Sequence, residues 1–182
     1  MNHTTLIAAG ACLVLGGAIG AGITSVVGLA AAADSSASLV AVTPERGRHI
    51  IRTSGCNDCH PAGYMERGEG VPESEWMTGM PVGFRGPWGT TYGSNLRLLA
   101  SQMDLQAWIA NARRTNGRPP MPWPAVHAMT DSDLAAVHAY LNRLNATTPP
   151  GEPAPAYVPP DAEPVTPYID MIPKMPAGAG GA

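Results

Sequence analysis

The sequence predicts an all-α fold with long loops, in which a large bound group completes a small core. Helix-start signals and apolar stripes of helical period recur along the chain, and no run of alternating apolar and polar residues predicts a strand. The loops between the expected helices are rich in Gly and Pro, and Phe84 is the only Phe among 182 residues. Because a small domain with so little apolar bulk is marginally stable, we expect a non-protein group to supply the missing buried surface.

Capping residues and apolar periodicity locate the helices. Thr43 suits the N-cap position and Pro44 the first turn of a helix that ends near Gly55. Thr130 caps the final helix, whose apolar side chains recur with helical spacing. Closely spaced prolines exclude regular structure from residues 116–124. The expected helical segments are residues 44–55, a short one at 73–78, then 103–114 and 131–144.

Residues 6–33 form an almost unbroken apolar run that indicates an export signal. No Lys or Arg precedes Arg46, and Ala31 and Ala33 have the small side chains that a signal peptidase requires. The run is also long enough to span a bilayer, so a retained membrane anchor is the alternative. We exclude a lipoprotein signal at Cys12, because too few residues precede it. The expected organisation is a signal peptide or anchor at 1–33, a linker at 34–42, a folded domain at 43–146 and a tail at 147–182.

The tail contains ten prolines and carries four acidic residues against one lysine. Such a segment buries too little apolar surface to offset its ordering entropy, so we expect it to be extended or disordered. Its larger apolar side chains are the exceptions that can dock on the domain: Tyr157, Tyr168, Ile169 and Met171.

Charge and cysteine content exclude two further classes of protein. Residues 43–148 hold ten Arg and nine acidic residues, so they lack the concentrated basic charge of a nucleic-acid-binding domain. Three cysteines in the whole chain are too few for a disulfide framework.

Residues 56–60 read Cys-Asn-Asp-Cys-His and match the pattern by which haem is attached covalently to protein. Two cysteines three residues apart at the end of a helix can reach both vinyl groups of the porphyrin, and the following His then lies under the iron. A zinc site would need two further ligands at suitable spacing, and a thioredoxin-like dithiol would need a βαβ context. We therefore predict one covalent haem c, held by Cys56 and Cys59, with His60 as an iron ligand.

The sixth iron ligand decides whether a haem carries electrons or binds small molecules. A Met sulfur stabilises ferrous iron and fills the position, whereas an open site favours oxygen, peroxide or NO chemistry. Met121 lies among prolines in a stiff loop before the final helix, so we predict that it is this ligand. The remaining candidates rank lower: Met77 and Met80 as reserve ligands, and Met129, His127 and His138 as packing or surface residues.

Taken together, these motifs resemble class I c-type cytochromes, especially bacterial periplasmic members with one haem. The matching segments are residues 46–60, which lead into the haem motif, 86–96, which resemble the segment along the haem edge, and 129–141 in the final helix. The resemblance covers residues 44–144 and implies a cytochrome c-like domain wrapped around its haem, with a long insertion after His60. It also implies that the Pro87 carbonyl accepts the Nδ1 proton of His60.

A buried haem propionate needs hydrogen-bond donors. Trp88, Tyr92, Asn95 and Arg97 are the candidate donors near the matched segment. The alternative is that Trp88 and Tyr92 only pack and that Arg97 is a solvated surface charge.

The expected function is one-electron transfer in the periplasm rather than catalysis. The expected donor is a dehydrogenase or quinol-oxidising complex, and the expected acceptor is an oxidase or another cytochrome. Contact with a membrane is expected only if residues 6–33 are retained. Two alternatives remain: a haem enzyme or gas sensor with an open sixth position, and a membrane-anchored cytochrome subunit of a larger complex.

Overall fold

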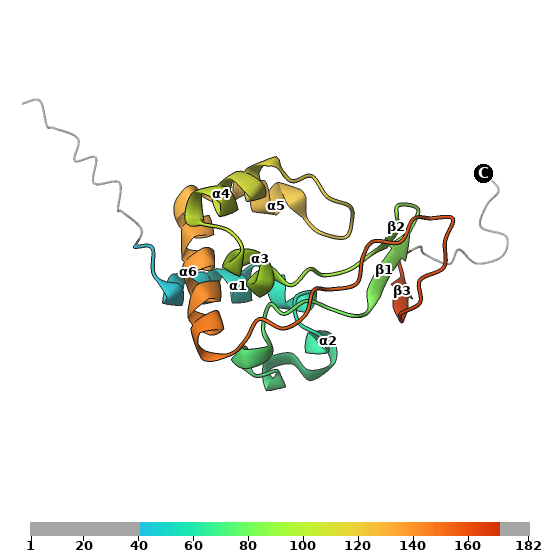
Figure 1. Cartoon of the computed structure of the whole chain (residues 1–182), viewed down its shortest axis with the longest axis horizontal. Coiled ribbons are helices and arrows are strands. Elements are labelled where there is room, and N and C mark those ends of the chain that lie inside the picture. Colours follow the sequence, from blue (N-terminus) through green and yellow to red (C-terminus); the bar gives the residue numbers. More distant parts are fainter. Residues whose placement is uncertain (1–40, 172–182) are drawn as a thin grey trace, which may run out of the picture. The chain divides into compact units, whose positions relative to one another are not determined.

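The computed structural model describes residues 41–171 (Figure 1). About 47% of these residues are helical and three short strands form a sheet, so the fold is mixed and the all-α prediction is wrong. The predicted signal or anchor at 1–33 lies outside the described residues, as does most of the linker at 34–42. Within residues 41–171, no helix has the length and apolar character needed to cross a membrane.

The α-helices of the described region are α1 (Pro44–Thr53), α2 (Tyr64–Arg67), α3 (Leu96–Ser101), α4 (Leu105–Arg114), α5 (Trp123–Ala128) and α6 (Asp131–Thr147). Three short 3-10 helices lie at Cys56–Asp58, Gly68–Gly70 and Glu73–Glu75. The strands are β1 (Gly83–Gly86), β2 (Gly89–Thr91) and β3 (Tyr168–Asp170). Each of the four predicted helical segments has a counterpart here, the segment at 73–78 as a single 3-10 turn.

The caps predicted for the first and last helices are confirmed. Thr43 Oγ1 accepts a hydrogen bond from the Arg46 amide at 3.2 Å. Thr130 and Asp133 form a capping box, in which each side chain binds the other residue's amide. Arg46 also forms an ion pair with Asp133, so the first turns of α1 and α6 are held together.

Helix α1 crosses α6 at Gly47, where the two backbones come close together. A Cβ atom at Gly47 would lie 2.0 Å from the Ala136 carbonyl oxygen and 2.9 Å from Tyr140 Cβ, so no larger residue fits. The main core extends from this crossing and includes Ile50, Ile51, Val71, Trp76, Met77, Trp108, Leu134, Val137, Leu141 and Leu144.

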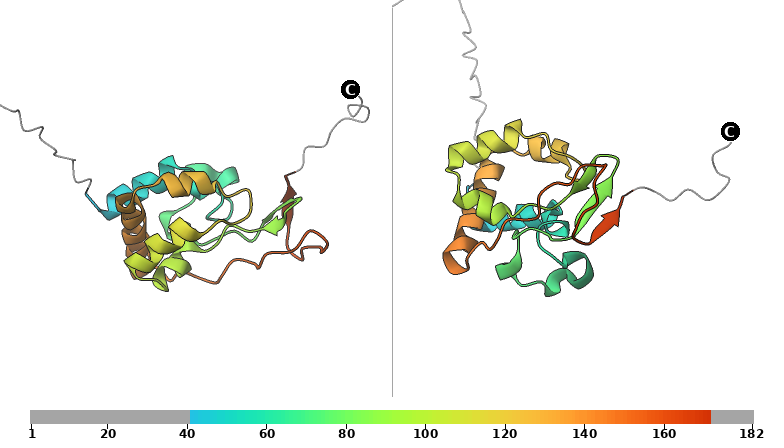
Figure 2. Two further views of the ribbon diagram at one scale, coloured as in Figure 1. Left: turned by 90° about the horizontal axis from the view of Figure 1, so that it is seen from above. Right: turned by 45° about the vertical axis from the view of Figure 1, so that its right-hand side comes forward.

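The sheet combines a hairpin with a strand from the tail. β1 and β2 pair antiparallel across the turn Pro87–Trp88, and β3 pairs parallel to β1, which gives the order β2-β1-β3 (Figure 2). The strands have three or four residues, and Gly occupies positions 83, 86 and 89. Such short, Gly-rich segments carry no alternating pattern, so their pairing depends on contacts between distant parts of the chain.

Three short α-helices, α2, α3 and α5, have no counterpart in the sequence-based prediction. α5 begins at Trp123 and places Pro124 in its first turn, where a backbone N–H is not needed. The exclusion of regular structure therefore holds only up to Pro122. α3 has a local signal, because the Asn95 side chain caps it by accepting from the Leu98 amide at 2.8 Å.

The first part of the tail, residues 149–158, packs along β2 and the start of α3. Asn95 Nδ2 donates hydrogen bonds to the carbonyl oxygens of Pro150 and Glu152, at 2.7 and 2.9 Å. Val158 exchanges two backbone hydrogen bonds with Thr90, at 2.7 and 3.0 Å. Figures 1 and 2 show this segment, in orange, leading from the end of α6 to the sheet.

The second part of the tail, residues 159–171, is tied to the hairpin. Arg85 binds both carboxylate oxygens of Glu163, at 2.6 and 2.9 Å, and also donates to the Tyr168 hydroxyl at 3.0 Å. Strand β3 follows, and the described region ends one residue later at Met171. Side chains of Tyr168, Ile169 and Met171 nevertheless remain about 40% exposed, so the docking relies on polar contacts and backbone pairing.

We expect Gly47→Ala to lower the free energy of unfolding by about 1–3 kcal/mol, because the new Cβ pushes α1 away from the Ala136 carbonyl. Denaturant unfolding measures the change. Gly70→Ala is the matched control, because a Cβ there meets no atom within 4 Å, and we expect it to change stability by less than about 0.5 kcal/mol. Wild-type stability of Gly47→Ala would contradict the close crossing.

We expect truncation after Thr148 to lower the melting temperature by about 4 °C or more, which corresponds to about 1 kcal/mol in a domain of this size. The physical reason is that Asn95, Thr90 and Arg85 all lose hydrogen-bond partners. Thermal unfolding followed by circular dichroism tests this. Truncation after Met171 keeps these contacts and serves as the control; equal melting temperatures for the two truncations would show that the tail adds no stability.

Candidate functional site

The Cys-x-x-Cys-His segment forms one compact turn directly after α1. Gly55 has a left-handed φ of 67° and leads into the 3-10 helix Cys56–Asp58. The His60 amide donates to the Cys56 carbonyl oxygen at 3.1 Å, so the turn folds back on its first residue. Both cysteines and the histidine therefore lie together beyond the C-terminal end of α1.

His60 is held in one tautomer by a backbone hydrogen bond. Its side chain is buried, and its Nδ1 lies 2.7 Å from the carbonyl oxygen of Ser94. A carbonyl only accepts, so Nδ1 carries the proton and Nε2 keeps its lone pair. Burial lowers the pKa of His60, opposed by the hydrogen bond to Ser94, so the ring stays neutral and able to bind a metal at neutral pH.

Ser94 rather than Pro87 provides the carbonyl for His60, so that prediction is wrong. Pro87 lies in the exposed turn between β1 and β2. Gly86 ends β1 and Pro87 begins the turn of the β1–β2 hairpin, so the Gly-Pro pair is used in the sheet. The acceptor is then supplied by the next segment of the chain, between β2 and α3.

Gly93 allows the Ser94 carbonyl to reach His60. A Cβ atom at Gly93 would lie 1.8 Å from the Cys59 carbonyl oxygen, so the two backbones are in direct contact there. The Gly93 carbonyl in turn accepts from the Met80 amide at 2.9 Å. The acceptor segment is thus fixed between the cysteine turn and the loop that precedes β1.

Cys56 and Cys59 do not form a disulfide with each other. Burial raises the pKa of Cys56 to about 11 and also raises the pKa of Cys59, and the Asp58 carboxylate acts in the same direction on both. A reactive dithiol depends on a lowered thiol pKa. The turn therefore lacks the electrostatics of a thioredoxin-like redox site.

Besides Arg46, three side chains have buried polar atoms without a hydrogen-bond partner in the described part of the chain. They are Asn57, through its amide oxygen and nitrogen, and Trp88 and Trp123, through their indole Nε1. Buried donors are normally paired, so the two indole N–H groups are available to an acceptor that is not part of residues 41–171. Trp88 is among the predicted contacts of the cofactor; Trp123 and Asn57 are not.

The other predicted propionate donors have partners within the protein. Arg97 is fully buried and Tyr92 shares a hydrogen bond of 2.8 Å with the Thr166 hydroxyl. Asn95 caps α3 and binds the tail, as described above. The acceptors around the Arg97 guanidinium are Asn145 Oδ1 and the carbonyl oxygens of Ser74, Leu144 and Thr148. These contacts give all three residues a role within the fold.

Met121 is half-buried in the loop between α4 and α5. His127 Nε2 donates to the Thr115 carbonyl at 3.0 Å and closes the loop at its base. Thr91 Oγ1 donates to the Pro119 carbonyl at 2.6 Å and ties the loop to β2. Figure 1 shows α5 and this loop across from the segment between β2 and α3, which carries Ser94.

The lower-ranked candidate ligands all either pack in the protein interior or form hydrogen bonds with backbone carbonyl oxygens. Met77 and Met80 are buried, and Met77 belongs to the main core. Met129 packs against the same core. His127 and His138 each place a ring nitrogen on a backbone carbonyl, at 3.0 and 3.1 Å.

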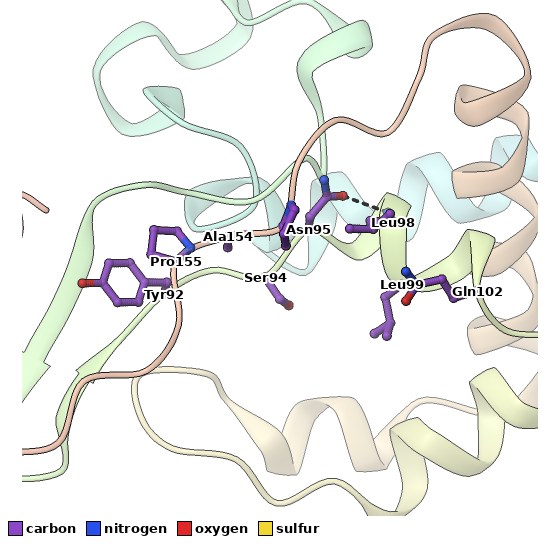
Figure 3. Close-up of a pocket in the computed structure, with 9 residues that line it drawn as sticks. Tyr92, Ser94, Asn95, Leu98, Leu99, Gln102, Ala154 and Pro155 are labelled. Atoms are coloured by element: carbon purple, nitrogen blue, oxygen red, sulfur yellow. Dashed lines mark hydrogen bonds between the residues drawn. The ribbon is translucent and has the colours of Figure 1, made fainter.

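An open cleft of about 230 Å³ lies beside Ser94 (Figure 3). In Figure 3 the Ser94 and Leu99 side chains point toward the side on which the α4 and α5 ribbons run. The cleft is lined by Tyr92, Ser94, Asn95, Leu98, Leu99, Gln102, Pro153, Ala154 and Pro155. The α3 and tail residues in this lining were not expected from the sequence, because the helix that presents Leu98 and Leu99 has only its Asn cap as a signal.

Among residues 41–171, no three His, Cys, Asp or Glu side chains cluster so that they could hold a metal ion by themselves. No protein-family model, curated protein or solved structure matches the chain.

Proposed function

We propose that this chain is an exported c-type cytochrome that carries one covalently attached haem and transfers single electrons. The observation that supports it best is the hydrogen bond from His60 Nδ1 to the Ser94 carbonyl, at 2.7 Å, within a Cys-x-x-Cys-His turn. An axial histidine needs this arrangement, because an acceptor on Nδ1 orients the ring and makes Nε2 a better ligand.

The residues of the turn fit a covalently bound haem. Cys56 and Cys59 would each add a thiol across one vinyl double bond, so that a C–S and a C–H bond form, an S–H bond breaks and no group leaves. His60 Nε2 and the Met121 sulfur would hold the haem iron. When bound, the haem supplies an iron that gains and loses one electron.

The rest of the chain would keep the ligands in place and exclude water. His60 is 5% exposed, and this burial favours the neutral ring that binds a metal. Trp88 and Trp123 offer unpaired indole donors that suit the haem carboxylates. Tyr92, Asn95 and Arg97 are better assigned to holding the fold, because their polar groups have protein partners.

A carrier role depends on a filled sixth position. Met121 lies in a loop that is tied to β2 and closed at its base, which suits a fixed ligand. The proposed partners are a periplasmic dehydrogenase or respiratory complex as donor and an oxidase or another cytochrome as acceptor. Export rests on the apolar run at residues 6–33.

We expect the wild-type protein to keep its haem after denaturation, because both thioethers are covalent. Haem-stained denaturing gels test this. Cys56→Ala combined with Cys59→Ala should carry no stain, and each single variant should keep one attachment site. Haem that is extracted from the wild type by acidified acetone would end the c-type assignment.

We expect Met121→Ala to lower the reduction potential, to abolish the Met–iron absorption band of the ferric protein and to let carbon monoxide bind the ferrous protein, since the variant lacks the sulfur ligand. Redox titration and absorption spectroscopy measure these properties. Met129→Ala and Met65→Ala, the latter at a 63% exposed position, are the controls and should resemble the wild type. Rapid carbon monoxide binding by the wild type would instead favour a haem enzyme or gas sensor.

A further inference from the structure

We infer that Tyr157 of the tail is a positioning residue. By stacking against Arg118, it keeps the Met121 loop (residues 115–122) closed. This inference rests on the proposed function, since it concerns how the sixth ligand is held. The Arg118 guanidinium carbon lies 3.6 Å from the centre of the Tyr157 ring. Arg118 precedes Met121 by three residues, so this contact acts on the loop that carries the ligand.

The Met121 loop has few other attachments to the protein. In the described chain, residues 116–120 make one hydrogen bond to the rest of the molecule, from Thr91 Oγ1 to the Pro119 carbonyl. Pro119 and Pro120 have no N–H to donate. The stacking of Arg118 on Tyr157 therefore ties this segment to the tail, in addition to the hydrogen bond at Pro119.

Tyr157 is itself fixed on the side away from the loop. Its hydroxyl donates to the Trp88 carbonyl at 2.9 Å, and the next residue, Val158, exchanges two backbone hydrogen bonds with Thr90. Gly89 makes room for this arrangement, because a Cβ there would lie 2.4 Å from the Val158 carbonyl and 2.8 Å from the Tyr157 ring. The ring is a fixed surface on which the arginine rests.

The tail thereby contacts both the Met121 loop and the segment that supplies the hydrogen-bond acceptor of His60. Its first residues bind Asn95, which directly follows the Ser94 acceptor of His60. Tyr157 binds Arg118 on the Met121 side. An exogenous ligand that replaces the Met121 sulfur requires the loop to move away, and this movement breaks the stacking contact. Losing the contact should therefore favour the displaced state.

Imidazole, which competes for the sixth position of ferric haem, is the probe. We expect Tyr157→Leu and Arg118→Gln each to raise the apparent affinity for imidazole by about two- to fivefold, the change in an equilibrium constant that corresponds to one partly exposed cation–π contact. The double variant should show no larger effect than either single variant. Tyr157→Phe keeps the ring and should bind imidazole nearly as the wild type does.

Glu163→Gln is the matched control. It weakens another contact between the tail and the domain, the ion pair with Arg85, but leaves the stacking of Arg118 on Tyr157 in place. We expect Glu163→Gln to leave imidazole binding unchanged, even if it lowers the melting temperature. A rise in affinity as large as that of Tyr157→Leu would show that general loosening of the tail, and not the stacking contact, controls the loop.

The outcomes separate this inference from the proposed function. If Met121→Ala raises imidazole affinity but Tyr157→Leu and Arg118→Gln do not, the positioning role is wrong and the cytochrome assignment stands. Additive effects in the double variant would also overturn it, because the two residues would then act independently. If the wild type holds no covalent haem, the proposed function fails, and the inference fails with it.

Discussion

The hydrogen bond between His60 Nδ1 and the Ser94 carbonyl joins two segments that are 34 residues apart, and much of the structure serves to hold its two ends. On one side, the close crossing of α1 and α6 at Gly47 sets where the cysteine turn leaves α1. On the other, Gly93 contacts the Cys59 backbone, and Asn95 begins α3 immediately after the acceptor. The His60 ring and the Ser94 carbonyl oxygen are thus positioned by contacts from α1, the cysteine turn and α3.

Arg97 joins the end of α6 to α3, the helix that follows the Ser94 segment. Its guanidinium is fully buried and meets carbonyl oxygens of Leu144 and Thr148, at the point where α6 gives way to the tail. Burial lowers the pKa of Arg97, and a buried charge without partners would be strongly destabilising. The acceptors around it offset that cost, and they fix the direction in which the tail leaves α6 toward Asn95. A residue that looks like a surface cation in sequence is therefore a structural link.

The helices with local signals were predictable, and the strands were not. Thr43 and Thr130 act within one turn of their own helices, so their effect is visible in a few consecutive residues. The pairing of β1 with β3 instead joins residues 83–85 to residues 168–170, and no local pattern encodes it. The effect of a proline on a helix depends on its position. Pro124 would break a helix in its interior but fits the first turn of α5.

For the site, the proposal of a covalent haem comes from the local sequence, because Cys56, Cys59 and His60 lie within five consecutive residues at the spacing of a haem-attachment motif. The carbonyl that accepts the His60 Nδ1 proton could be found only from the folded protein, because Ser94 reaches His60 through a close backbone approach that no local pattern reveals. The tertiary structure also decided that the tail stacks against the loop of Met121, through Tyr157. Spacing within a turn is a property of the local chain, whereas the partner of a buried polar atom depends on which distant segments pack together.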